Sequence, residues 1–180
     1  FAPDYIAFIY LASFQSARKR SISRSGAKEV GSATVLDTKP LLLAMSAPPK
    51  KSYVLVTAAR NEEQYIGLCI ESVLSQSILP YKWVIVNDGS TDHTEIIVNK
   101  YEKNHPFIQL IRHEHDQTME GFASKAFALS MGAKLLTDID YFLIGHLDAD
   151  ITFKKDYYAI MLDKFNDNPK LGIAGGYFFE

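Results

Sequence analysis

The sequence predicts an α/β protein with a mainly parallel sheet and helices on both of its faces. From residue 53 onward, apolar runs of strand length alternate with stretches of helix length. The apolar runs are continuous, which is typical of strands that are buried on both faces. Because parallel strands are joined by crossovers that are usually helices, this alternation favours a parallel sheet covered by its own connections.

Each expected element has its own pattern. Strands are expected at the five apolar runs 53–57, 83–86, 107–111, 141–147 and 171–174. The first helix is predicted by a stripe with i, i+3, i+4, i+7 and i+8 spacing, formed by Ile66, Cys69, Ile70, Val73 and Leu74. Three further helices are expected at 95–101, 122–136 and 156–165.

The chain of 180 residues divides into two unlike parts. Residues 1–50 carry seven Lys or Arg and three Asp or Glu, whereas residues 51–180 carry twelve and eighteen. The apolar run 5–14 is shorter than the ~20 residues that a membrane-spanning helix needs. We therefore expect residues 1–51 to be an extension of uncertain order, either foreign sequence or the remnant of an anchor, and residues 52–180 to form the domain. The sequence has no initiator Met, and Glu180 follows an apolar run, so we expect a fragment that is cut at both ends, with the domain truncated at the C-terminus.

Composition excludes several functional classes. A net charge of −2 lacks the positive excess that is typical of proteins that bind nucleic acid. The single cysteine, Cys69, excludes an intramolecular disulfide framework and a multi-cysteine zinc site, and fits a cytoplasmic location. The sequence contains no Gly-x-Ser-x-Gly, Walker A or Gly-x-Gly-x-x-Gly motif, so common hydrolase, P-loop and dehydrogenase functions lack support.

Polar clusters with acidic residues follow three of the expected strands. They occupy residues 58–63, 87–92 and 148–150. Ligands of open parallel sheets bind outside the carboxyl ends of the strands, so these clusters are expected to converge on one rim.

Asp148 and Asp150 are the expected metal ligands. In an extended segment residues i and i+2 point the same way, which brings two like charges together. A cation between them relieves the repulsion, and Mg2+ or Mn2+ commonly binds one or two carboxylates plus substrate phosphates. An Asp-x-Asp tripeptide also recurs on solvated loops, so the prediction depends on its place directly after an apolar strand.

Other polar residues have structural alternatives. Asn61 and Asp92 each lie three residues before a Gln or Glu, a spacing that suits helix capping, and capping is the favoured role of Asn61. Asp88 precedes a glycine and is harder to explain as a cap, so it is a candidate to accept hydrogen bonds from a nucleoside. Lys125 near a helix start indicates either an anionic ligand or a solvated side chain.

His113, His115 and Asp116 superficially resemble a metal cluster. Neighbouring strand residues point to opposite faces, and no further ligand spacing supports a site there.

Four segments in fixed order resemble the family 2 glycosyltransferases, whose fold is the Rossmann-like GT-A fold. The segments are VLVTAARNEE (54–63), SVLSQ (72–76), VNDGSTD (86–92) and LDAD (147–150). A further element, SKAFALSMG (124–132), is similar to the family's Gly-Lys-Ala-x-Ala-Leu-Asn-x-Gly, with Ser124 and Ser130 in place of Gly and Asn. The resemblance covers residues 52–180.

The resemblance implies the donor-binding part of an inverting enzyme that transfers a sugar from a nucleotide-diphospho-sugar. By position, Asp88 contacts the nucleobase or ribose and Lys125 lines the donor site. Asp148 faces the ribose or the metal, and Asp150 ligates the metal on the diphosphate. The implied nucleotide-sugar-binding residues are Ala58, Asn61, Glu62, Glu63, Asp88, Ser90, Lys125 and Asp148. In the family the general base comes later in the chain, so the catalytic base is expected beyond Glu180.

The resemblance also implies the ligands. Mn2+ or Mg2+ is the expected metal, a UDP-sugar is the favoured donor, and the acceptor is a sugar, a polysaccharide or a lipid-linked molecule. A nucleotidyltransferase and a non-catalytic nucleotide-sugar-binding module are the alternatives. A nucleotidyltransferase would be favoured by a glycine-rich, basic loop after the first strand, where residues 58–61 are Ala-Ala-Arg-Asn. The expected location is cytoplasmic, with peripheral association at the membrane face as an option.

Overall fold

The computed structural model describes residues 10–13, 52–115, 118 and 121–176. Its sheet has six strands in the order β4-β3-β2-β5-β1-β6. The strands are β1 (Tyr10–Ser13), β2 (Tyr53–Ala59), β3 (Lys82–Asp88), β4 (Ile108–His113), β5 (Leu143–His146) and β6 (Ile173–Ala174). The helices are α1 (Ile66–Leu74), α2 (Thr94–Asn104), α3 (Phe122–Lys134) and α4 (Tyr157–Asp167).

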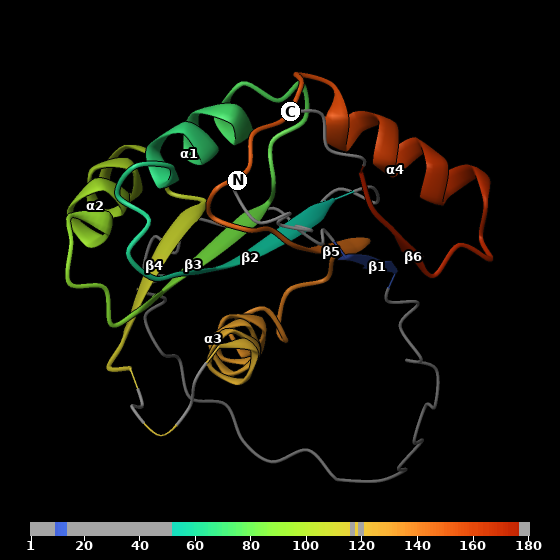
Figure 1. Cartoon of the computed structure of the whole chain (residues 1–180). Helices are drawn as coiled ribbons and strands as arrows, with labels where there is room; N and C mark the ends of the chain where they lie inside the picture. The colour runs from blue at the N-terminus through green and yellow to red at the C-terminus, as the bar shows by residue number, and fades with distance from the viewer. Residues whose placement is uncertain (1–9, 14–51, 116–117, 119–120, 177–180) are drawn as a thin grey trace, which may run out of the picture.

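The described part of the chain forms three layers (Figure 1). Helices α1, α2 and α4 cover one face of the sheet, and α3 covers the other. Strands β4, β3, β2 and β5 are parallel, and β1 pairs antiparallel with both of its neighbours. The predicted mainly parallel sheet with helices on both faces is therefore confirmed, and each expected strand and helix is present with shifted ends.

Strand β1 is the element that the sequence pattern did not predict. It lies between β5 and β6, with Tyr10 opposite His146 and Leu11 opposite Ala174. Its backbone groups pair with those of β5, which would otherwise be an unpaired edge. The rest of the expected extension, 1–9 and 14–51, lies outside the described residues, so its order and any anchor role stay predictions. Among the helices described, none is long and apolar enough to cross a membrane.

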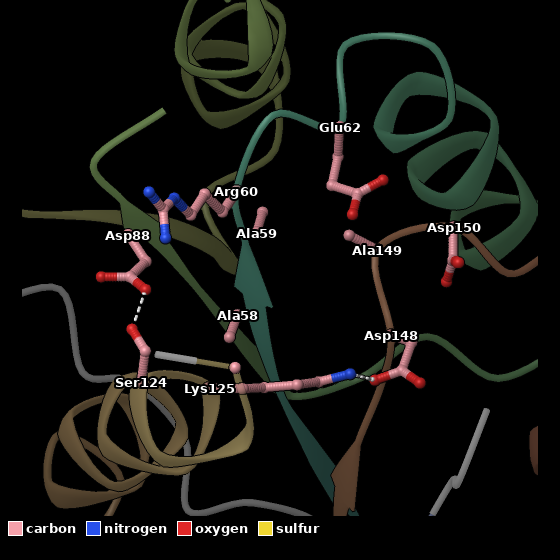
Figure 2. Close-up of a pocket in the computed structure, with 11 residues that line it drawn as sticks. Ala58, Ala59, Arg60, Glu62, Asp88, Ser124, Lys125, Asp148, Ala149 and Asp150 are labelled. Carbon is pink, nitrogen blue, oxygen red and sulfur yellow. Dashed lines mark hydrogen bonds and ion pairs between the residues drawn. The ribbon is translucent and has the colours of Figure 1, made fainter. Parts of the chain in front are cut away.

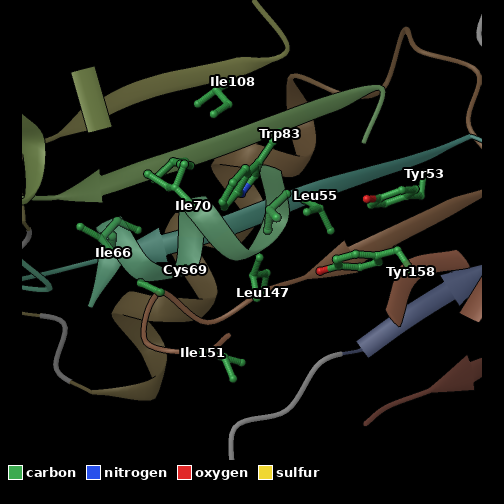
Figure 3. Close-up of a cluster of buried hydrophobic side chains, with 14 of the residues drawn as sticks. Tyr53, Leu55, Ile66, Cys69, Ile70, Trp83, Ile108, Leu147, Ile151 and Tyr158 are labelled. Carbon is green, nitrogen blue, oxygen red and sulfur yellow. The ribbon is translucent and has the colours of Figure 1, made fainter. Parts of the chain in front are cut away.

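Two apolar clusters hold the layers together, one on each face of the sheet. Successive residues of β2 alternate between them, with Leu55 in the cluster under α1 and α4 and Val56 in the cluster against α3. Trp83 is fully buried at the centre of the first cluster (Figure 3), where its indole N–H donates to Thr57 Oγ1 at 3.0 Å. The strand ends that bear the polar clusters are thus fixed by a packed core.

Candidate functional site

A pocket of about 330 Å³ opens at the carboxyl end of the parallel strands (Figure 2). Strands β2 and β3, the segment after β5 and the start of α3 all contribute to its wall. The lining residues are Ala58, Ala59, Arg60, Glu62, Asp88, Gly121, Ser124, Lys125, Asp148, Ala149 and Asp150. The polar clusters at these strand ends therefore do converge on one rim.

Pairing with β2 carries the end of β5 to the pocket. The amide of Leu147 donates to the carbonyl of Val56 at 2.9 Å, one residue beyond the end of β5. The carbonyl of Asp148 then accepts from the Cys69 thiol of α1 at 3.5 Å, and the side chain of Ala149 is buried in the core. The extended geometry expected for 148–150 was wrong, since Ala149 and Asp150 form a turn. Asp148 and Asp150 nevertheless both line the pocket.

One side of the pocket is crowded with carboxylates. Burial raises the pKa of Glu62, and the negative charges of Asp150, Asp92 and Asp148 act in the same direction, whereas Lys125 lowers it. Lys125 reaches across the pocket from α3, with its Nζ 2.5 Å from Asp148 Oδ1 (Figure 2). Lys125 thus faces Glu62, Asp148 and Asp150 on this side. Over the whole wall four acidic residues, Asp88 included, outnumber Lys125 and Arg60, which leaves an excess of negative charge.

The raised pKa of Glu62 predicts a pH-dependent gain in stability from the Glu62→Gln variant. Ionisation of Glu62 costs more in the folded than in the unfolded state, so the charge destabilises the fold above its raised pKa. The penalty disappears as the pH falls below the ordinary value of 4.5. Urea unfolding should give a higher midpoint for the variant at pH 7 and a smaller difference at pH 5. An equal difference at both values would contradict this account.

The opposite side of the pocket is built around Asp88, the last residue of β3. Asp88 is buried, and its Oδ2 accepts a hydrogen bond from Ser124 Oγ at 2.5 Å. His115 Nδ1 lies 3.2 Å from the same oxygen. Asp88 Oδ1 has no hydrogen-bond partner among the described residues. This carboxylate is therefore fixed through one oxygen while the other is left unsatisfied.

The turns after β2 and β3 are joined by hydrogen bonds just outside the pocket. Asn61 has a positive φ of 57°. Its Oδ1 accepts from the backbone N–H of Thr91 at 2.8 Å, and its own backbone N–H donates to Ser90 Oγ at 3.0 Å. Glu63 Oε2 accepts from the amide of His93 at 2.9 Å. These contacts tie the rim together between two neighbouring strands.

The capping prediction was wrong for Asn61, whereas Asp92, for which capping and a site role were both open, binds at the start of a helix. Helix α1 begins at Ile66 and no side chain caps it, because Asn61 binds across to the other turn. Asp92 Oδ1 does accept from the amide of Thr94, the first residue of α2. Its expected capping-box partner, Glu95, instead binds Asn87 and Arg112.

The predicted site residues fall into two groups. Those that line the pocket are Ala58, Glu62, Asp88, Lys125, Asp148 and Asp150. Asn61, Glu63 and Ser90 lie in the joined turns and do not line it, so a role of theirs toward a nucleotide stays a prediction. Sequence reasoning gave no site role to Arg60, His115 or Ser124, although the polar segment 113–116 was a signal that a site lay near.

The donor set fits a hard divalent cation. Asp148 and Asp150 supply only carboxylate oxygens, which Mg2+ and Mn2+ prefer, and the surplus of negative charge, to which Glu62 adds, would be relieved by a cation. Of the residues that superficially resembled a metal cluster, His113 and His115 both face Asp88, and Asp116 lies outside the described residues. Over the described part of the chain, no group of three or more His, Cys, Asp or Glu is arranged to hold a metal ion. Any cation would therefore need further ligands from its substrate.

Comparison with known proteins identifies the family. The family model described as "Glycosyl transferase family 2" matches residues 54–179, which is more than half of the chain. The chain belongs to glycosyl transferase family 2. The match includes every described residue of the pocket wall, so the site lies within the family domain.

Curated relatives of this family 2 chain include two polysaccharide synthases. A poly-beta-1,6-N-acetyl-D-glucosamine synthase of Staphylococcus epidermidis is 34% identical over 119 residues, which cover 66% of this chain and 26% of the relative. A chondroitin synthase of Escherichia coli is 32% identical over 116 residues, which cover 64% of this chain and 16% of the relative. The family 2 chain thus spans about a quarter or less of the length of these relatives.

Solved structures confirm the GT-A fold of this family 2 domain. The S. aureus TarS fragment 1-349 in complex with UDP superposes with a TM-score of 0.53 at 21% identity, over 64% of this chain and 32% of that one. The mannosyltransferase PcManGT of Pyrobaculum calidifontis, in complex with GDP-Man and Mn2+, gives a TM-score of 0.51 at 20% identity, over 70% and 36%. At these identities the likeness extends to the fold alone.

Proposed function

We propose that this chain is the donor-binding part of an inverting glycosyltransferase that uses a nucleotide-diphospho-sugar and a divalent cation. The observation that carries the proposal is the pocket itself, whose wall has a fixed carboxylate on one side and a carboxylate cluster with one ammonium on the other. A nucleoside diphosphate has matching chemistry, with N–H and O–H donors at one end and a charged diphosphate at the other. Family membership supports this choice over a nucleotidyltransferase.

Each end of the donor is assigned to one side of the pocket. Asp88, which lines the pocket, would accept hydrogen bonds from the nucleoside. Lys125 would bind the diphosphate, and its position in the first turns of α3 places it beside the positive end of that helix. Asp148 and Asp150, with Glu62 beside them, would hold Mn2+ or Mg2+.

These roles fit the chemistry of sugar transfer. When the bond from the anomeric carbon to the phosphate breaks, negative charge develops on the diphosphate leaving group. A bound divalent cation supplies Lewis-acid stabilisation of that charge. Lys125 adds a second positive charge, while buried Asp88 holds the nucleoside so that the reacting bond keeps its position. Inversion also requires a base for the acceptor hydroxyl, and we assign no pocket residue to that step.

Comparisons favour a uridine donor and a polysaccharide acceptor. One solved neighbour, TarS, is described in complex with UDP and with UDP-GlcNAc, and the named relatives are polysaccharide synthases. The neighbour PcManGT is described with GDP-Man and Mn2+, which makes guanosine donors the necessary comparison.

Calorimetry of a nucleotide panel tests the proposal directly. UDP, GDP, dTDP and ADP would be titrated into the protein with Mn2+ and with EDTA. We expect UDP to bind most tightly and each diphosphate to bind more tightly with Mn2+. Absence of binding by every nucleotide, with and without Mn2+, would overturn the proposed function.

Replacing Lys125 with methionine is expected to change two affinities in opposite directions. The ammonium competes with any cation at Asp148, so the Lys125→Met variant should bind Mn2+ alone about 2- to 5-fold more tightly. Loss of a charge-assisted contact should weaken UDP binding about 10-fold. Electron paramagnetic resonance of free Mn2+ and calorimetry with UDP measure the two effects. Lys134→Met, at the other end of α3, is the matched control, and equal shifts in both variants would contradict the role of Lys125.

A further inference from the structure

Three polar side chains around Asp88 are not explained by donor binding alone. They are Ser124 on α3, His115 after β4, and Arg60 after β2. Arg60 Nη1 lies 2.7 Å from His115 Nε2, and His115 Nδ1 lies 3.2 Å from Asp88 Oδ2. Arg60, His115 and Asp88 therefore form a continuous chain of hydrogen bonds from the guanidinium through the imidazole to the buried carboxylate.

The chemistry of arginine determines where the proton of His115 lies. A guanidinium has N–H donors and no acceptor, so the contact with Arg60 requires His115 Nε2 to accept. A nitrogen that accepts carries no proton, so the ring proton is on Nδ1. The ring can then donate that proton to Asp88 Oδ2, the same oxygen to which Ser124 donates.

Asp88 is consequently held in an asymmetric state. Oδ2 accepts from Ser124 Oγ and lies 3.2 Å from His115 Nδ1, which is also 3.2 Å from Ser124 Oγ, whereas Oδ1 is buried and has no partner among the described residues. The nearby His113 Nε2 lies 4.0 Å from Oδ1, which is beyond hydrogen-bond distance. A buried carboxylate oxygen without a donor is costly, so it favours a ligand that brings one.

Close packing keeps His115 in this position. Gly89 follows Asp88 with a φ of 64°, and a Cβ on it would lie 2.7 Å from His115 Cβ and 2.8 Å from the His115 amide nitrogen. The backbone that carries His115 therefore lies directly on the residue after Asp88. This contact limits how far the imidazole can move away from the carboxylate.

We propose that Arg60 and His115 are positioning residues that aim Asp88 at the nucleoside. Arg60 holds His115 as its Nδ1–H tautomer, and His115 together with Ser124 fixes Asp88 Oδ2, so that the carboxylate keeps its place in the pocket wall. The inference rests on the proposed function, because it assumes that Asp88 receives the nucleoside. It adds a way of controlling affinity for the nucleoside end of the donor that is separate from the diphosphate and the cation.

Nuclear magnetic resonance measures the tautomer directly. Long-range 1H–15N spectra distinguish Nδ1–H from Nε2–H imidazoles, and the signal that disappears in His115→Ala identifies His115. We expect the Nδ1–H tautomer in the unaltered protein and the Nε2–H form in Arg60→Met. An Nε2–H ring in the unaltered protein would overturn the proposal.

Binding of UMP in EDTA tests the consequence for the nucleoside end. We expect His115→Ala to bind UMP about 10-fold more weakly and His115→Asn, whose side-chain amide can replace the Nδ1–H donor, to stay within about 3-fold. His105→Ala, at the end of α2, is the control and should leave the affinity unchanged. Equal weakening by alanine and asparagine at position 115 would overturn the positioning role. If no nucleotide binds the unaltered protein, the proposed function itself fails, whatever the tautomer.

Discussion

The Asp150→Ala variant is expected to lose the effect of Mn2+ on UDP binding. Asp150 lines the pocket with Asp148, and the ammonium of Lys125 already occupies one oxygen of Asp148. In the proposed cation site, Asp150 is therefore expected to be the ligand that contributes most. We expect the affinity for UDP in Mn2+ to fall roughly 100-fold, to the value measured in EDTA, because loss of a direct ligand exceeds the 10- to 100-fold cost of an outer contact.

The same variant should respond in the opposite sense without metal. Removal of a negative charge beside the diphosphate lowers repulsion, so UDP affinity in EDTA should stay equal or rise slightly. Asp138→Ala removes an equal charge from an exposed turn outside the pocket wall and controls for net charge. Calorimetry in Mn2+ and in EDTA gives all the values needed. If Asp150→Ala keeps its Mn2+ dependence, the cation is held elsewhere.

The fold and one half of the site follow directly from sequence patterns. Continuous apolar runs predicted parallel strands because a strand that is covered by helices on both faces has no solvent-exposed face and needs no polar residues. Asp88, Asp148 and Asp150 were placed on one rim because parallel strands end at one edge. Both predictions depend only on hydrophobic periodicity and on the direction of the chain, and both can be read from short segments of the sequence.

The remaining features depend on contacts between distant segments. Asn61 looked like a cap because its local spacing suits one, but its partner is Thr91 of the neighbouring turn. Arg60 and His115 are 55 residues apart in the chain, and no local pattern links them. Strand β1 was missed since four residues of an apolar run do not indicate which edge they will pair with. Tertiary pairing decided each of these outcomes.

Gly132 on α3 is expected to be the most sensitive glycine of the helices. A Cβ there would lie 2.5 Å from Val56 Cγ1 and 3.2 Å from Val86 Cγ2. Both neighbours are β-branched residues of central strands with little rotamer freedom. Overpacking of a core costs about 1–3 kcal/mol. Alanine also gains up to ~1 kcal/mol in helix propensity, so we expect Gly132→Ala to lower the free energy of unfolding by about 1–2 kcal/mol.

Two further variants separate the steric cause from the helix effect. Gly67 in α1 has its nearest neighbour, Ile97 Cγ2, at 3.8 Å, so Gly67→Ala should stabilise the protein by up to ~1 kcal/mol. The Val56→Ala change removes the atom that Gly132→Ala would meet, so the double variant should lose less stability than the sum of the two single changes. Urea unfolding at pH 7 gives the free energies of the unaltered protein, the three single variants and the double variant. Additive losses would mean that α3 tilts away from the sheet instead of pressing on Val56, and the pocket residues of α3, Ser124 and Lys125, would then move with it.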